Sequence, residues 1–154
     1  MKPSTSFLLL LILSSSACIN YQRPGEKSSY LNTVQFGMNE VSSNLEEYLD
    51  ARSSFNDGGI DRIEAYEYAQ MEHSRNQDIA ERLNATAVPQ GFEGFHALVL
   101  SFTGHISLVY EYDMECIKTR DNSTCMKAKE EAAQARNASD EAMGELARLG
   151  VEVD

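Results

Sequence analysis

The sequence contains no tryptophan and only three histidines, three cysteines and three prolines among its 154 residues. So few histidines and cysteines leave little material for a catalytic centre or for a metal site with several ligands. The chain also lacks the Gly-x-Ser-x-Gly, Gly-rich phosphate-loop and His-Glu-x-x-His motifs of hydrolases, nucleotide-binding proteins and metalloproteases. We therefore expect a protein that is not an enzyme and that binds no cofactor.

Positively charged residues are scarce as well. The 13 Lys and Arg residues stand against 24 Asp and Glu residues, for a formal net charge of −11. Nucleic-acid binding needs clustered basic side chains, and here they are scattered along the chain. The charge balance therefore predicts no nucleic-acid partner and no polybasic contact with anionic lipids.

Long apolar runs are also lacking, and the longest is Phe7–Leu13 with seven residues. This run is far below the roughly 20 residues that span a bilayer, but it has the length of the apolar core of a signal peptide. Lys2 precedes it, and Ser15 and Ala17 are the small residues that a signal peptidase accepts before its cleavage site. We therefore predict a signal peptide over residues 1–17 and export of the remaining chain.

The three cysteines divide into a pair and a single residue. Cys116 and Cys125 lie nine positions apart on either side of the turn-like stretch TRDNST. Export places them in an oxidising compartment, where a disulfide between them would stabilise the fold by about 2.5–3 kcal/mol on the chain-entropy model. Cys18 is then an odd cysteine that needs another explanation.

The segment Ser15–Cys18, in which small residues immediately precede a cysteine, follows a Leu-rich run. This segment resembles the lipobox of bacterial lipoproteins, although Ser15 stands where that family prefers leucine, and the resemblance covers only the leader. It implies that Cys18 is diacylated and becomes the first residue of the mature protein, since two acyl chains hold a protein stably at a membrane. The alternative is ordinary cleavage, which would leave an incidental thiol on Cys18.

The exported chain divides into a short linker and one domain. Residues 18–28 are polar and contain Pro24 and Gly25, a composition typical of a flexible tether. Residues 29–150 are long enough for a single core and contain no visible internal repeat.

Helical spacing of apolar residues predicts four helices, at about residues 29–52, 60–87, 91–119 and 124–149. In chain order, their apolar seams are Leu31, Val34, Met38, Val41, Leu45 and Tyr48; Ala65, Tyr68, Ala69, Ile79, Ala80, Leu83 and Ala87; Phe92, Phe95, Val99, Phe102, Ile106, Val109, Tyr110 and Ile117; and Ala128, Ala132, Ala135, Ser139, Ala142, Leu146 and Leu149. No stretch shows the alternation of a strand. Short connections favour antiparallel neighbours, so we predict an all-α, antiparallel up-down-up-down four-helix bundle whose third and fourth helices are stapled by the disulfide.

Four polar residues lie in or beside these apolar seams: Glu72, Asn76, His96 and Asp113. Polar groups in such positions need partners, so they either form hydrogen bonds between helices or line a ligand pocket. A di-iron carboxylate site would need a second Glu-x-x-His besides the one that ends at His96, and the sequence has none. We therefore expect no metal site.

The sequence contains three N-x-S/T sequons, at Asn84, Asn122 and Asn137. About one or two would arise by chance in a chain rich in Asn, Ser and Thr, so the sequons decide little, and whether they are used depends on the source organism.

Two functional hypotheses follow from these features. The first is a non-enzymatic lipoprotein of the cell envelope, held at the membrane by a lipid on Cys18, that binds another envelope protein or has a structural role. The alternative is a soluble secreted or periplasmic module that binds a small ligand or a metal through the polar positions inside the bundle.

Overall fold

A computed structural model describes residues 25–151, which form four helices and no strand. The helices are α1 (Glu26–Asn56), α2 (Arg62–Asn84), α3 (Glu93–Thr119) and α4 (Asn122–Arg148). The prediction of an all-α chain with four helices is therefore confirmed. The predicted signal peptide, Cys18 and the first part of the tether lie outside the described residues.

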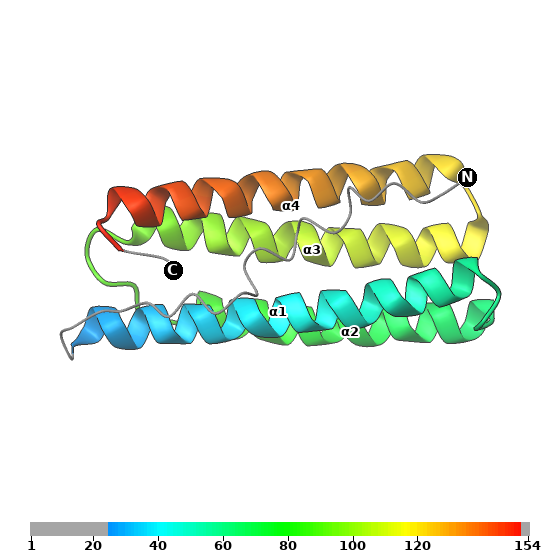
Figure 1. The fold of residues 1–154 in the computed structure, drawn as a ribbon, viewed down its shortest axis with the longest axis horizontal. Coiled ribbons are helices and arrows are strands. Elements are labelled where there is room, and N and C mark those ends of the chain that lie inside the picture. The colour runs from blue at the N-terminus through cyan, green and yellow to red at the C-terminus, as the bar shows by residue number, and fades with distance from the viewer. Residues whose placement is uncertain (1–24, 152–154) are drawn as a thin grey trace.

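The four helices lie side by side along the long axis of the molecule (Figure 1). The α1–α2 and α3–α4 connections lie at one end, and the α2–α3 connection lies at the other (Figure 1). α3 packs most extensively against α4 and also against α2, while α1 packs along α2. Side chains of α1 also reach α3, as the contacts of Tyr30 and Tyr48 show below.

The helix boundaries differ from the predicted ones by a few residues. α1 begins at Glu26 and continues to Asn56, so residues 26–28 are helical although we expected them in the tether. Gly58 adopts a positive φ of 78° in the α1–α2 connection, a conformation that glycine accepts without steric cost. α2 ends at Asn84, three residues before the predicted end.

Side-chain caps explain where α2 and α4 begin. The Asp61 carboxylate accepts hydrogen bonds from the backbone N–H groups of Ile63 and Glu64, and the Glu64 side chain accepts one from the Asp61 N–H. Such a reciprocal capping box satisfies N–H groups that have no partner within the helix. Asp121 caps α4 by accepting from the Ser123 N–H.

Only Arg120 and Asp121 separate α3 from α4. Arg120 adopts a left-handed conformation with φ 58°, and its N–H donates to the Cys116 carbonyl at 2.8 Å. This tight reversal brings Cys116, in the last turn of α3, next to Cys125, in the first turn of α4. Their sulfur atoms are bonded at 2.02 Å, so the predicted disulfide is present.

The core consists largely of the predicted seams. All eight residues of the seam over 92–117 are buried, whereas Met38 in the first helix and Ser139 and Leu149 near the end of the chain are half-buried. Tyr68 is 42 % exposed, and Ala87 is exposed beyond the end of α2, so the assignment of these two residues to the second seam was wrong. Ala80 of the same seam is half-buried. α3 is the most apolar of the helices, yet no helix within residues 25–151 is long and apolar enough to cross a membrane.

Gly104 and Gly144 offer a direct test of the helix packing. Both lie inside helices, and a Cβ atom placed on either one would meet no atom within 4 Å. Gly104→Ala and Gly144→Ala should therefore each raise the free energy of unfolding by about 0.5–1 kcal/mol, because alanine loses less backbone entropy than glycine. Urea denaturation measures this gain. Gly58→Ala is the control and should lower stability, and a loss of stability in either helix variant would contradict the packing described here.

Candidate functional site

The four predicted site residues lie in three separate places. Glu72 and Asn76 are fully buried on α2, where Asn76 faces α3. Asp113 and His96 are both on α3 but 17 residues apart, which corresponds to about 25 Å along a helix. The four residues therefore do not line one common pocket.

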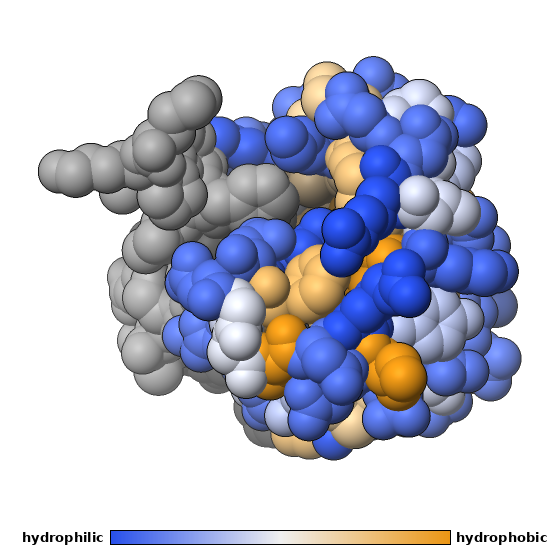
Figure 2. All heavy atoms as spheres, turned by 90° about the vertical axis from the view of Figure 1, so that its right-hand side faces the viewer, coloured by the Kyte–Doolittle hydropathy of each residue, from blue (hydrophilic) through white to orange (hydrophobic). Residues whose placement is uncertain are grey.

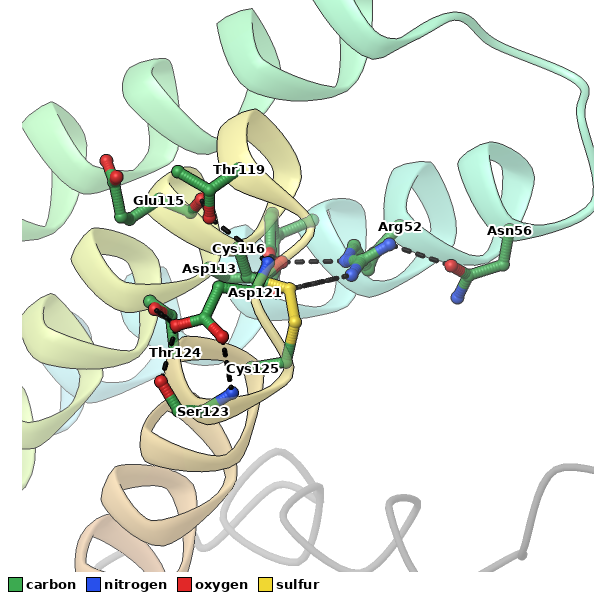
Figure 3. Close-up of a disulfide and its surroundings, with 11 residues drawn as sticks. Arg52, Asn56, Asp113, Glu115, Cys116, Thr119, Asp121, Ser123, Thr124 and Cys125 are labelled. Carbon is green, nitrogen blue, oxygen red and sulfur yellow. Dashed lines mark hydrogen bonds and ion pairs between the residues drawn. A yellow bond between two sulfur atoms is a disulfide. The ribbon is translucent and has the colours of Figure 1, made fainter.

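Asp113 joins α3 to α1 (Figure 3). Its carboxylate accepts hydrogen bonds from the Tyr48 hydroxyl and from Arg52, whose Nε lies 2.7 Å from Oδ2. A second guanidinium nitrogen, Nη2, lies 3.4 Å from Oδ1, so the ion pair is bidentate. Such a pair fixes direction as well as distance, so it sets the position of α1 against α3 near the disulfide end.

Burial and the neighbouring carboxylate raise the pKa of Tyr48 well above its ordinary value. The phenol therefore stays protonated and serves as the hydrogen donor to Asp113. The Tyr48 ring also packs edge-on against the ring of Tyr110, with 5.0 Å between the centroids. Tyr48 thus connects the Asp113 ion pair to the middle of α3.

Arg52 lies between Asp113 and Cys116 on one side and Asn56 on the other (Figure 3). Its Nη2 is 3.8 Å from the Sγ atom of Cys116, and its Nη1 donates to the Asn56 side chain at 2.7 Å. The guanidinium also lies over the Phe55 ring, 5.2 Å from the centroid. These contacts hold the charged group in one position, where it serves as a structural clamp between α1 and the end of α3.

Asn76 is the main polar contact between α2 and α3. Its Nδ2 donates to the Thr103 carbonyl oxygen at 2.9 Å and to the Ser107 hydroxyl at 2.7 Å. Oε1 of Glu72, one helical turn earlier on α2, accepts from Nη1 of Arg75 at 2.8 Å. Burial raises the pKa of Glu72, even though the Arg75 charge acts in the opposite direction.

Three buried polar atoms in this region have no hydrogen-bond partner among residues 25–151. They are Oε2 of Glu72, Oδ1 of Asn76 and the hydroxyl oxygen of Tyr110. Burial raises the pKa of Tyr110, and the Glu72 carboxylate adds to this effect, so the two groups influence each other across the α2–α3 interface. Burial thus leaves these three atoms without a partner among the described residues of the core.

His96 lies at the opposite end of α3, next to the beginning of α1. Its Nδ1 is 3.1 Å from the Tyr30 hydroxyl, and Tyr30 is in turn packed against the rings of Phe92 and Phe95. Burial lowers the pKa of His96, which favours the neutral ring. In the tautomer with its proton on Nε2, Nδ1 accepts the hydrogen bond from the Tyr30 hydroxyl. The pair fastens the first turns of α1 and α3 to each other.

The remaining histidines and carboxylates do not converge on a metal. Within the part of the chain that the structure describes, no group of three or more His, Cys, Asp and Glu side chains could hold a metal ion. His105 pairs with Glu131 of α4 at 2.6 Å, on a different side of α3 from His96.

Apolar side chains on the surface are few and dispersed. Figure 2 shows the end of the molecule that carries the α1–α2 and α3–α4 connections, where hydrophilic side chains separate the apolar ones. The large apolar side chains that are exposed belong to three different helices: Phe36, Ile63, Tyr68, Met71 and Met126.

The partners of the four polar residues were not predicted from the sequence. Tyr30, Tyr48, Arg52 and Ser107 supply hydrogen bonds to His96, Asp113 and Asn76, and they lie between 31 and 66 positions away along the chain. The tyrosines carried a usable signal, because a tyrosine in a core seam needs a partner for its hydroxyl group. The position of each partner depends on how the helices are aligned.

Comparisons of the chain with protein-family models, with curated proteins and with solved structures find no match.

Removal of the Asp113 carboxylate tests the α1–α3 ion pair. Asp113→Ala should lower the free energy of unfolding by about 2–3 kcal/mol, because it leaves Arg52 and the Tyr48 hydroxyl without their partner. Chemical denaturation measures the loss. Asp140→Ala is the matched control, since Asp140 pairs with Arg136 on the solvent side of α4, and it should cost less than about 0.5 kcal/mol. Equal effects of the two variants would contradict the structural role of Asp113.

The depressed pKa of His96 predicts a dependence of stability on pH. Below the ordinary histidine pKa of 6.5 the unfolded chain takes up a proton before the folded chain does. Folding stability should therefore fall as the pH is lowered below about 6.5. His96→Gln should remove this component, so the wild-type and variant curves of unfolding free energy should converge between pH 7.5 and 5.5. Parallel curves would show that His96 titrates alike in both states. The raised pKa of Glu72 makes folding stability change with pH in the opposite direction. Because Glu72 is present in both the wild type and the His96→Gln variant, its contribution cancels when the two curves are compared.

Proposed function

We propose that the chain is a non-enzymatic exported lipoprotein that is held at the cell envelope by a lipid on Cys18. It acts there by binding another envelope protein or as a structural component. Its domain is an antiparallel up-down-up-down four-helix bundle whose third and fourth helices are stapled together at one end.

The observation that carries this proposal is the pairing of the cysteines. The sequence has three, and Cys116 and Cys125 are bonded to each other. Cys18 then has no cysteine left to pair with in its own chain. An unpaired cysteine at the end of a signal-like leader is the residue that lipoproteins modify, and two acyl chains give a stable anchor.

The short distance between Cys18 and the first helix also supports an envelope location. α1 begins at Glu26, so residues 19–25 are the whole connection between the proposed anchor and the domain. Seven residues span at most about 25 Å when fully extended. A lipid on Cys18 would therefore keep the beginning of α1 close to the membrane, and the disulfide end of the molecule would point away from it.

The buried charges support a role without catalysis. Asp113 is engaged by Tyr48 and Arg52, and Glu72 by Arg75, so each charged side chain holds helices or turns together. A disulfide at the outer end is also typical of proteins in oxidising compartments.

Mass spectrometry of the protein purified from its native source tests the anchor. The mature chain should begin at Cys18 and carry the additional mass of acyl chains, and it should fractionate with membranes. Cys18→Ala should release it to the soluble fraction, whereas Cys125→Ala should leave it with the membranes. An unmodified N-terminus at Cys18, or cleavage at another position, would contradict the proposal.

A further inference from the structure

The middle of the α2–α3 interface contains three side chains whose polar atoms are buried but incompletely bonded. Glu72, Asn76 and Tyr110 each have 0 % of their surface exposed. Their atoms without a partner among the described residues are Oε2, Oδ1 and the phenolic oxygen. An unpaired polar atom in a core is costly, so three of them in one region call for a common explanation.

The three atoms come from neighbouring positions. Glu72 and Asn76 are four residues apart on α2, which places their Cβ atoms about 5–6 Å apart on one side of the helix. Asn76 is bonded to Ser107 at 2.7 Å, and Tyr110 follows Ser107 by less than one turn of α3. Because α2 and α3 run in opposite directions (Figure 1), the turn before Asn76 on α2 lies at the level of the turn after Ser107 on α3, which places Glu72 and Tyr110 at the same level of the bundle. The Glu72 charge accordingly adds to the raised pKa of Tyr110.

The hydrogen-bonding capacity of the three atoms is complementary to that of a single water molecule. The carboxylate oxygen and the amide oxygen can only accept, while the phenol can donate its proton. Water has two hydrogens to donate and lone pairs to accept, and buried waters typically make about three hydrogen bonds. One water could therefore donate to Oε2 and Oδ1 and accept from the Tyr110 hydroxyl, which would satisfy all three.

The local charge favours a neutral occupant over a cation. Oε1 of Glu72 is already paired with the Arg75 guanidinium at 2.8 Å, so the negative charge of the carboxylate is largely balanced. The other two ligands are an amide oxygen and a phenol, both uncharged. A monovalent cation would bring a second positive charge to a buried carboxylate that has its counter-ion.

We propose that Glu72, Asn76 and Tyr110 form a binding site for a single internal water molecule that bridges α2 and α3. This water completes the polar contacts of Asn76 with α3, and it extends them to Tyr110. The Tyr110 ring packs against Tyr48, and Tyr48 donates to Asp113, so the water site adjoins the contact between α1 and α3.

A crystal structure of the full chain at high resolution tests the site directly. Crystals grown with sodium as the only monovalent cation should show one electron-density peak within hydrogen-bond distance of the three oxygen atoms. A second crystal soaked in thallium acetate should give no anomalous peak at this position. A thallium peak would overturn the proposal in favour of a cation site, and an empty position would overturn it as well.

Tyr110→Phe gives an independent test in solution, because the direction in which it shifts the thermal midpoint of unfolding depends on whether the phenol has a partner. If water accepts the Tyr110 hydrogen bond, the variant loses that bond and its thermal midpoint should fall by about 3–5 °C. If the hydroxyl is unbonded, the variant removes a buried orphan group, so the midpoint should stay the same or rise. Tyr112→Phe is the control: Tyr112 is half-buried on the same helix, and its variant should leave the midpoint unchanged. A constant or raised midpoint for Tyr110→Phe would overturn the proposal.

Discussion

Water must be kept away from the broad apolar face of α3, and the other helices are arranged around that requirement. Eleven residues of this helix are buried, including all the aromatic residues of its apolar seam. A helix that is apolar on most sides cannot remain exposed, because each large side chain left in water costs about 1.5–3 kcal/mol. α4 meets this need with a seam of alanines, whose small side chains let the two helices approach closely. α2 and α1 cover the rest of the apolar face, while a stripe that includes Ser101, Glu111 and Glu115 stays in water.

The buried polar side chains follow from the same constraint. Once α1 and α2 cover α3, any polar residue on the facing surfaces loses its water and needs a partner from a neighbouring helix. Asp113 finds Tyr48 and Arg52 on α1, and Asn76 finds Thr103 and Ser107 on α3. These bonds are directional, so they define how the helices are aligned where apolar contacts alone would tolerate sliding. Asn76 serves this alignment, and neither Asn76 nor Glu72 is part of a pocket shared with His96.

Local sequence determined the helices and the disulfide, and these were predictable. The apolar spacing identified four segments, and the nine-residue separation of Cys116 and Cys125 identified the pair. The failures had physical causes. Apolar spacing does not distinguish a core position from one at the edge of the buried stripe, and Tyr68 is 42 % exposed although Ala65 and Ala69 beside it are buried. The partners of Asp113 lie 61 and 65 positions earlier in the chain, and only the alignment of α1 against α3 brings them together.

The account depends most on the claim that α1 is fastened to α3 through Asp113. A double-mutant cycle of Tyr48→Phe and Asp113→Ala, followed by urea denaturation, measures this coupling without counting the other contacts of either residue. Because the hydroxyl and the carboxylate are bonded to each other, the two losses of stability should overlap by about 1–2 kcal/mol. Losses that add to within about 0.3 kcal/mol would show that the two groups act independently, and they would contradict the arrangement of α1 against α3.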